Sequence, residues 1–182
     1  ADKAAYLTVF QRTPHWISPN RDYYRPVEDG IVWALNHLPL YAEWHRARMI
    51  FGFMDTNWPN VPGDPAWPYK ERSMNEGNDA LREALTGYIS EQLGDRQDLM
   101  DTCVPDFPVF GKRLIIDNNW YQSMSRQDIT LTNSPIDRFH KGGIETEDGK
   151  QHEFDVVIFA TGFNTNLFLW PMDVVGRTGV SL

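Results

Sequence analysis

The sequence predicts an α/β fold in which a partial dinucleotide-binding, Rossmann-like sheet is interrupted by a largely helical insertion and carries a β-meander. Two apolar runs, residues 6–10 and 155–160, have the composition of strands. The second run is apolar almost without interruption, which is typical of a strand buried on both faces of a parallel sheet. Residues 19–106 instead place apolar side chains at helical spacing.

The first strand, at residues 6–10, is expected to stop before Pro14 because proline has no N–H to continue a ladder. Two helices are expected next, at residues 26–38 and 40–54. They are divided around Pro39, since proline disrupts the interior of a helix.

A proline-rich loop at residues 57–69 precedes a third helix. Asn78 is its expected N-cap and Gly94 its expected end. The apolar side chains between them recur at offsets that share one helical face: Leu81, Leu85, Tyr88, Ile89 and Leu93. This helix is therefore expected to be amphipathic.

The rest of the chain alternates short elements. A strand at 113–116, a helix at 120–125 and a strand at 129–132 are expected first. A meander follows, with strands at 136–139, 143–146 and 151–154 and a tight turn at 147–150.

These elements divide the chain into four predicted segments. They are the start of a nucleotide-binding domain at 1–18, the helical insertion at 19–106, the remainder of that domain at 107–159 and a linker at 160–182. The helical segment thus interrupts the α/β domain.

The composition excludes several classes of function. The 182 residues carry 17 Lys and Arg against 25 Asp and Glu, a formal net charge of −8, so binding to nucleic acid is not expected. No apolar stretch reaches the roughly 20 residues of a membrane span. The single cysteine, Cys103, forms no intrachain disulfide or thiolate zinc cluster and indicates a cytoplasmic location. The five histidines lack the spacing of metal ligands, and no metal is expected.

Arg12 and Thr13 follow the first strand directly. In dinucleotide-binding folds, an acidic residue at the equivalent strand end binds the ribose of NAD, whereas an arginine accommodates the 2′-phosphate of NADP. Arg12 offers a planar group that is always charged, and Thr13 adds a hydroxyl donor. An exposed loop arginine without a ligand is the alternative that these residues leave open.

Lys112 and Arg113 stand at the entrance of the strand expected at 113–116. Neighbouring strand residues point to opposite faces, so the two cations can serve two pockets, one holding a phosphate and one where negative charge develops. A solvated basic pair at the start of a strand is the alternative.

Ala160, Thr161 and Gly162 end the apolar run at 155–160. Ligands of open α/β sheets lie beyond the carboxyl ends of the strands, and glycine lets the backbone approach a ligand closely. An ordinary glycine between strand and loop explains the same residues.

Three stretches together resemble flavin-dependent Baeyer–Villiger monooxygenases. They are LTVFQRTPHW at residues 7–16, FGKRLI through WY at residues 110–121, and DVVIFATGF at residues 155–163. Their order and the helical insertion between the first two also fit that family. The resemblance covers nearly the whole chain, and within the family it is strongest to 4-hydroxyacetophenone monooxygenases.

The resemblance implies a parent enzyme that uses FAD, NADPH and O2 to insert one oxygen atom into a ketone, giving an ester or a lactone. Arg12, Thr13 and Lys112 would hold the 2′-phosphate of NADPH, and Arg113 would lie against the flavin and stabilise anionic charge. Residues 160–162 would belong to the turn between the NADP and FAD domains.

The departures from the family are also informative. The chain has neither of the two glycine-rich dinucleotide loops and lacks the family's signature motif built around a His and a Trp. We therefore expect a fragment of the NADP domain without an FAD site of its own and without activity in isolation. Surfaces that an FAD domain would cover are expected to be apolar and to allow self-association.

Two alternatives stay open. Another flavoprotein with two dinucleotide sites, oxidising nitrogen or sulfur, would share the turn at 160–162 but would not need the Lys112–Arg113 pair. A non-catalytic helical module that binds a partner through exposed Trp and Pro side chains belongs to a different class. The identity of the ketone is not predicted.

Overall fold

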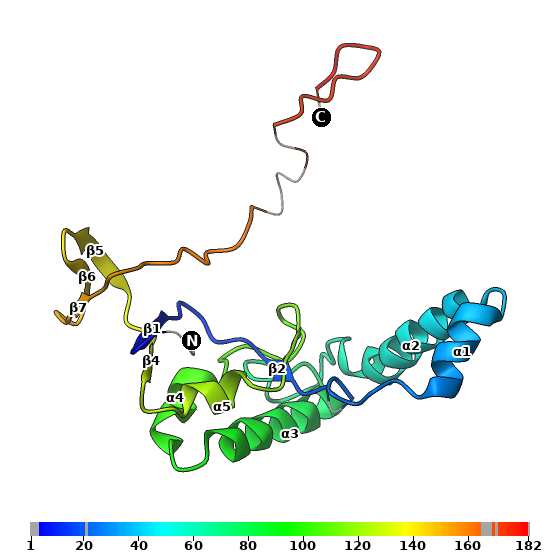
Figure 1. Cartoon of the computed structure of the whole chain (residues 1–182), viewed down its shortest axis with the longest axis horizontal. Helices are drawn as coiled ribbons and strands as arrows, with labels where there is room; N and C mark the ends of the chain where they lie inside the picture. Colours follow the sequence, from blue (N-terminus) through cyan, green and yellow to red (C-terminus); the bar gives the residue numbers. More distant parts are fainter. Residues whose placement is uncertain (1–3, 21, 165–168, 170, 182) are drawn as a thin grey trace. The chain divides into compact units, whose positions relative to one another are not determined.

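The computed structural model describes residues 4–20, 22–164, 169 and 171–181 (Figure 1). The chain divides into two compact units, Ala1–Ile136 and Asp137–Leu182. The segment boundaries expected from the sequence stay a prediction. Part of the expected linker, residues 165–168, 170 and 182, lies outside the described residues.

Two parallel strand pairs form the α/β part of the first unit. β1 (Leu7–Phe10) pairs along its whole length with β4 (Ile129–Thr132). β2 (Ile17–Ser18) pairs in parallel with β3 (Ile115–Ile116). Parallel pairs of this kind are the building elements of a dinucleotide-binding sheet, and the predicted fold class is confirmed.

Helices fill the chain between β2 and β3 and the gap between β3 and β4. The order is α1 (Asp29–His37), α2 (Tyr41–Asn57), the 3-10 turn η1 (Trp58–Asn60), α3 (Glu76–Leu93), the 3-10 turn η2 (Gln97–Leu99), α4 (Met100–Cys103) and then, after β3, α5 (Trp120–Met124). The division around Pro39 is confirmed. The ends of α1 and α2 differ from the expected ones by a few residues, as is usual for sequence-based boundaries.

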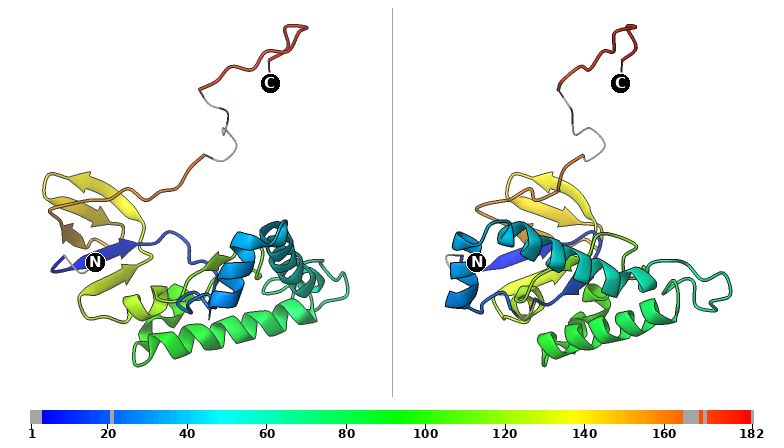
Figure 2. Two further views of the ribbon diagram at one scale, coloured as in Figure 1. Left: turned by 45° about the vertical axis from the view of Figure 1, so that its right-hand side comes forward. Right: turned by 90° about the vertical axis from the view of Figure 1, so that its right-hand side faces the viewer.

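The hydrophobic core is built on α3. Its side chains Leu85, Ile89 and Leu93 are buried, and Ile89 is completely inaccessible. Around them pack buried residues from the strands, the loops, η2, α4 and α5: Trp16, Ile17, Leu99, Cys103, Val109, Tyr121, Met124, Ile129 and Leu131. Figure 2 shows α3 running alongside the shorter α5. The amphipathic face expected for this helix is therefore confirmed.

The start of α3 differs from the prediction. Asn75 is the N-cap instead of Asn78, and its side-chain oxygen accepts a hydrogen bond from the Asn78 N–H at 2.8 Å. Asn78 is fully buried in the first turn, where its amide donates to Asn60 O and Val109 O. Both asparagines have capping chemistry, and the prediction is wrong because Asn78 is used for tertiary hydrogen bonds. Gly94 ends the helix as expected.

The second unit contains the meander, apart from its first residue, Ile136. β5 (Ile136–His140), β6 (Gly143–Thr146) and β7 (Gln151–Glu153) form one sheet in that order (Figure 2). β6 and β7 are antiparallel, and the turn between them contains Gly149 with a φ of +80°. The meander is confirmed.

The strand expected at 155–160 is wrong. Residues 155–164 have no regular secondary structure, and Ile158 and Phe159 are 82% and 70% exposed. An apolar run becomes a buried strand only when a neighbouring strand accepts its backbone hydrogen bonds, and no described segment does so here.

Among the described residues, none of the helices combines the length and apolar character needed to cross a bilayer. Cys103 is a buried free thiol on α4. Burial raises the pKa of Cys103 to about 11, which keeps this thiol protonated near neutral pH.

Candidate cofactor-binding site

The loop after β1 carries Arg12 and Thr13. Arg12 is exposed and Thr13 is half-buried. Gln11 fixes the chain just before them, because its side-chain amide donates to Thr102 O and to Asn133 Oδ1, both at 3.0 Å. The loop therefore starts from a point anchored to two other segments.

Trp16 anchors the far end of the same loop. Its side chain is 2% exposed, and its indole N–H donates to Phe107 O at 2.9 Å. The Tyr121 hydroxyl on α5 donates to His15 O at 3.2 Å. Burial raises the pKa of Tyr121, so the hydroxyl keeps the proton that it donates. The loop is thus held at both ends.

The turn at 107–111 forms the second part of the site. Val109 is completely buried, and its carbonyl accepts a hydrogen bond from the Asn78 amide at 2.9 Å. Phe110 has a φ of 67°, a left-handed conformation that costs about 1 kcal/mol or more in a residue other than glycine. A strained residue persists only where its surroundings hold it, and here the buried Val109 does so.

Gly111 closes this turn where a side chain does not fit. A Cβ at this position would lie 2.9 Å from Pro108 O and 3.3 Å from the Phe107 ring. We expect Gly111→Ala to lower the free energy of unfolding by about 1–3 kcal/mol, measured by chemical denaturation. Gly87→Ala on α3 is the matched control, because nothing lies within 4 Å of its Cβ, and it should not destabilise the chain. Equal stability of the two variants would contradict the crowding argument.

The Phe107 ring joins the loop to the turn. Lys112 Nζ lies 4.6 Å from the centroid of this ring, and the His15 ring meets it edge-on with centroids 6.2 Å apart. His15 belongs to the loop that carries Arg12. Lys112 and His15 therefore contact the same ring, although the two segments are far apart in the sequence.

Arg113 follows Lys112 and precedes β3, which is limited to Ile115–Ile116 instead of the expected 113–116. The Arg113 side chain is exposed. In the described part of the chain, no carboxylate forms an ion pair with Arg12, Lys112 or Arg113. Three cations without carboxylate partners in a chain of net charge −8 suit an anionic ligand.

The remaining predicted site residues, Ala160, Thr161 and Gly162, lie in the second unit and are exposed. Gly162 has a φ of +83°, in the left-handed region that glycine adopts without strain. The Ala160 N–H donates to Ile158 O at 3.2 Å, so this segment turns locally instead of ending a strand. The contact of these residues with a cofactor stays a prediction.

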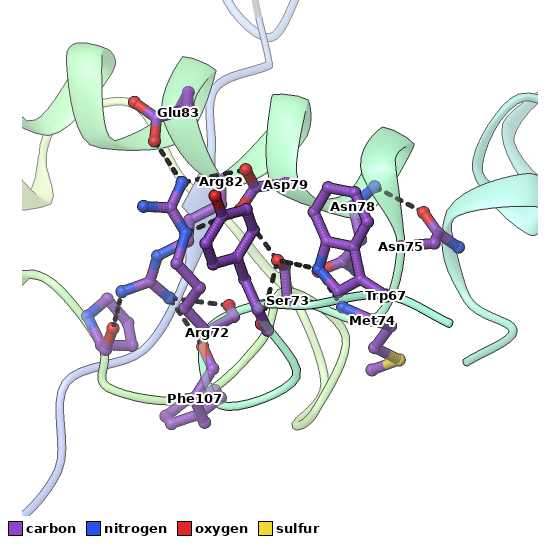
Figure 3. Close-up of polar contacts among 12 residues, drawn as sticks. Trp67, Arg72, Ser73, Met74, Asn75, Asn78, Asp79, Arg82, Glu83 and Phe107 are labelled. Carbon is purple, nitrogen blue, oxygen red and sulfur yellow. Dashed lines mark hydrogen bonds and ion pairs between the residues drawn. The ribbon is translucent and has the colours of Figure 1, made fainter. Parts of the chain in front are cut away.

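The sequence did not single out Arg82 of α3, which contacts both parts of the site. Its guanidinium donates to Arg72 O and Phe107 O at 3.2 Å and to Pro105 O at 3.0 Å (Figure 3). It also lies 5.0 Å from the centroid of the Trp16 ring. Desolvation by burial lowers the pKa of Arg82, but a guanidinium remains charged. No sequence signal distinguishes this arginine from a solvated helix residue.

The described residues fit the anionic end of NADP. An arginine fork, an ammonium group and a hydroxyl, from Arg12, Lys112 and Thr13, are the donors that a 2′-phosphate requires. No group of metal-ligating side chains occurs among the described residues.

Comparison with known proteins identifies relatives over the whole chain, although no protein-family model matches it. The uncharacterized monooxygenase y4iD of Sinorhizobium fredii is 36% identical over 98% of this chain and 27% of its own length. A Baeyer-Villiger monooxygenase of Pseudooceanicola batsensis is 27% identical over 98% of this chain and 37% of its own length. The phenazine N-monooxygenase PhzNO1 of Lysobacter antibioticus is 27% identical over 72% of this chain and 23% of its own length. The chain thus spans about a quarter to a third of the curated relatives that it matches.

Solved structures share the fold. The crystal structure of OTEMO in complex with FAD and NADP matches with a TM-score of 0.71 and 24% identity, over 100% of this chain and 38% of that one. A cyclohexanone monooxygenase mutant from Rhodococcus sp. Phi1, bound to NADP+, matches with a TM-score of 0.69 and 23% identity, over 99% of this chain and 39% of that one.

Fold and sequence together indicate the class: this chain is similar to a part of monooxygenases, including FAD-binding ones. More narrowly, it matches a segment of the flavin-dependent Baeyer–Villiger monooxygenases, which confirms the resemblance found in the motifs. The narrower similarity to 4-hydroxyacetophenone monooxygenases stays a prediction.

Proposed function

We propose that the full-length protein is an FAD- and NADPH-dependent monooxygenase that inserts one oxygen atom of O2 into a ketone to give an ester or a lactone, and that this chain holds its NADP. One observation carries the proposal: Arg12, Lys112 and Arg113 are exposed and have no carboxylate partner among the described residues. The names of the relatives support the type of reaction.

In this proposal, different residues bind different parts of the cofactors. When bound, NADPH supplies a hydride and FAD carries the oxygen chemistry. Arg12 and Lys112 bind the 2′-phosphate, with the Thr13 hydroxyl as a further donor. The Phe107 ring lies against Lys112 and limits the directions that its ammonium group can take.

Arg113 serves the reaction centre. It follows Lys112 directly, ahead of β3, and its side chain is exposed. Its guanidinium remains charged at any working pH and stabilises negative charge that develops in a site from which water is excluded. A lysine at this position would lose its proton more easily on burial.

The proposal includes the setting of the protein. We place it in the cytoplasm, with a ketone and O2 as its small-molecule partners and residues 160–162 near the cofactors. The isolated chain is expected to be inactive and to self-associate, because its apolar side chains are exposed on α2 and along residues 156–159. Trp44 and Phe51 are examples, at 56% and 65% exposed.

Oxidation of a ring nitrogen is the second candidate. The observation that favours it is the match to phenazine N-monooxygenase PhzNO1. It requires the same NADP site, so the two candidates differ in the substrate and not in the roles of Arg12 and Lys112.

The test is a product analysis of the full-length protein with FAD, NADPH and ¹⁸O2. A panel of aryl and cyclic ketones is compared with phenazine, and products are identified by mass spectrometry. We expect esters or lactones that contain one ¹⁸O atom, with one NADPH consumed per product. An N-oxide product would favour the second candidate. Product formation that does not require NADPH would contradict both candidates.

A further inference from the structure

Two elements hold the carbonyl of Phe107. Arg82, from α3, donates to it at 3.2 Å, and the Trp16 indole N–H, from the loop after β1, donates to it at 2.9 Å. Arg82 also binds the neighbouring Pro105 O and lies over the Trp16 ring. The backbone at the start of the turn is therefore fixed from two directions.

The positive charge of Arg82 is directed at carbonyl oxygens and not at a carboxylate. Arg72, nearby in Figure 3, is different, because it binds the Asp79 carboxylate through two nitrogens and also contacts Glu83. Within the described residues, Arg82 forms no ion pair. Its removal would take the Arg82 donor from the partly buried Pro105 O and leave Phe107 O with the Trp16 N–H alone, which is more costly than losing an exposed pair.

The fixed backbone has a consequence for Lys112. The same Phe107 whose carbonyl is held by Arg82 presents its ring to Lys112 Nζ. A small rotation of the backbone at Phe107 would move this ring and, with it, the ammonium group. The placement of Lys112 therefore depends on a residue that stands thirty positions earlier in the sequence and contacts no cofactor group.

We infer that Arg82 is a positioning residue for the recognition of the NADP 2′-phosphate, acting through the Phe107 carbonyl and the turn that carries Lys112. This inference rests on the proposed function. It assigns selectivity for NADPH over NADH in part to a helix residue of the insertion. The hydrogen bonds of Arg82 go to backbone carbonyls, so its role in this inference is indirect.

The experiment compares Arg82→Met with Arg72→Met in the full-length protein. The readout is the ratio of kcat/KM for NADPH to that for NADH. We expect Arg82→Met to lower this ratio by roughly fivefold to tenfold, with kcat at saturating NADPH little changed. Arg72→Met should leave the ratio within about twofold of wild type, because Arg72 does not contact the turn through its side chain. A purely structural role of Arg82 would affect both cofactors equally, and an unchanged ratio would overturn the inference.

A milder variant decides the matter if Arg82→Met does not fold. Trp16→Phe removes the indole donor to Phe107 O together with some buried ring volume, and it keeps an aromatic face for Arg82. We expect it to lower the ratio by about threefold, and no change would again overturn the inference.

The Arg12→Ala variant distinguishes a failure of this inference from a failure of the proposed function. If Arg12→Ala lowers the ratio but neither Arg82→Met nor Trp16→Phe does, only the role of Arg82 is overturned. If the wild type shows no preference for NADPH, the proposed function fails, and the inference fails with it.

Discussion

The Arg113→Ala variant of the full-length protein is expected to form no ester or lactone from a ketone that the wild type converts. Arg113 is exposed and has no ion-pair partner among the described residues, so its charge is available to an anionic reaction centre. Without this charge, negative charge that develops in the reaction would lose the stabilisation that the guanidinium supplies. Product is measured by gas chromatography, with NADPH consumption followed in parallel.

Two controls belong to this experiment. Arg25→Ala removes an exposed arginine that pairs with Asp22, and it should retain wild-type product formation. Arg113→Lys tests whether any cation suffices, and we expect only partial recovery because an ammonium group lacks the planar fork. Near-normal product formation by Arg113→Ala would refute the catalytic role.

For Arg12→Ala, we expect the KM for NADPH to rise by roughly 10- to 100-fold while the KM for NADH changes little. One charge-assisted contact to the 2′-phosphate would be lost, and NADH has no such phosphate. Steady-state kinetics with both cofactors measures the effect. The difference should shrink as the salt concentration rises, since Arg12 is exposed and its charge is screened.

The matched control for Arg12 is Arg96→Ala. Arg96 is also on the first unit, but its guanidinium is bound by the Asp98 carboxylate through two hydrogen bonds of 2.9 Å. Its replacement should leave both KM values unchanged. If Arg12→Ala raised the two KM values by the same factor, the assignment of the 2′-phosphate to Arg12 would be wrong.

The regular elements could be predicted because their patterns are local. β1 is an apolar run, β4 alternates with period 2, the meander has a clear turn at Gly149, and α3 shows a helical period that ends at Gly94. The N-cap of α3 could not be predicted with the same accuracy. Asn75 and Asn78 have the same side-chain chemistry, and only the burial of Asn78 against Val109 distinguishes them.

Residues 155–160 show that strand composition alone does not produce a strand. Their composition is that of a strand buried on both faces, but burial depends on neighbours and not on composition alone. Ile158 and Phe159 are exposed because no described strand pairs with their backbone. The composition therefore indicated that the segment prefers a strand conformation, but it did not indicate whether a neighbouring strand would bury it.

The sequence selected the cations of the candidate site but not the residues that support them. Arg12, Lys112 and Arg113 stand at expected strand ends, so residue type and position were enough to select them. Arg82 and Asn78 act on backbone carbonyls at 105–109, and such long-range contacts to the main chain leave no pattern in the sequence.

The pairing of β1 with β4 also constrains how the protein is made. The two strands come from opposite ends of the first unit, and Leu7 meets Ile129 only after the intervening helices have been synthesised. On the ribosome, α3 and its neighbours can begin to condense before β1 pairs with β4. The late closure of this pair leaves the β4-facing edge of β1 open until residues 129–132 have been synthesised.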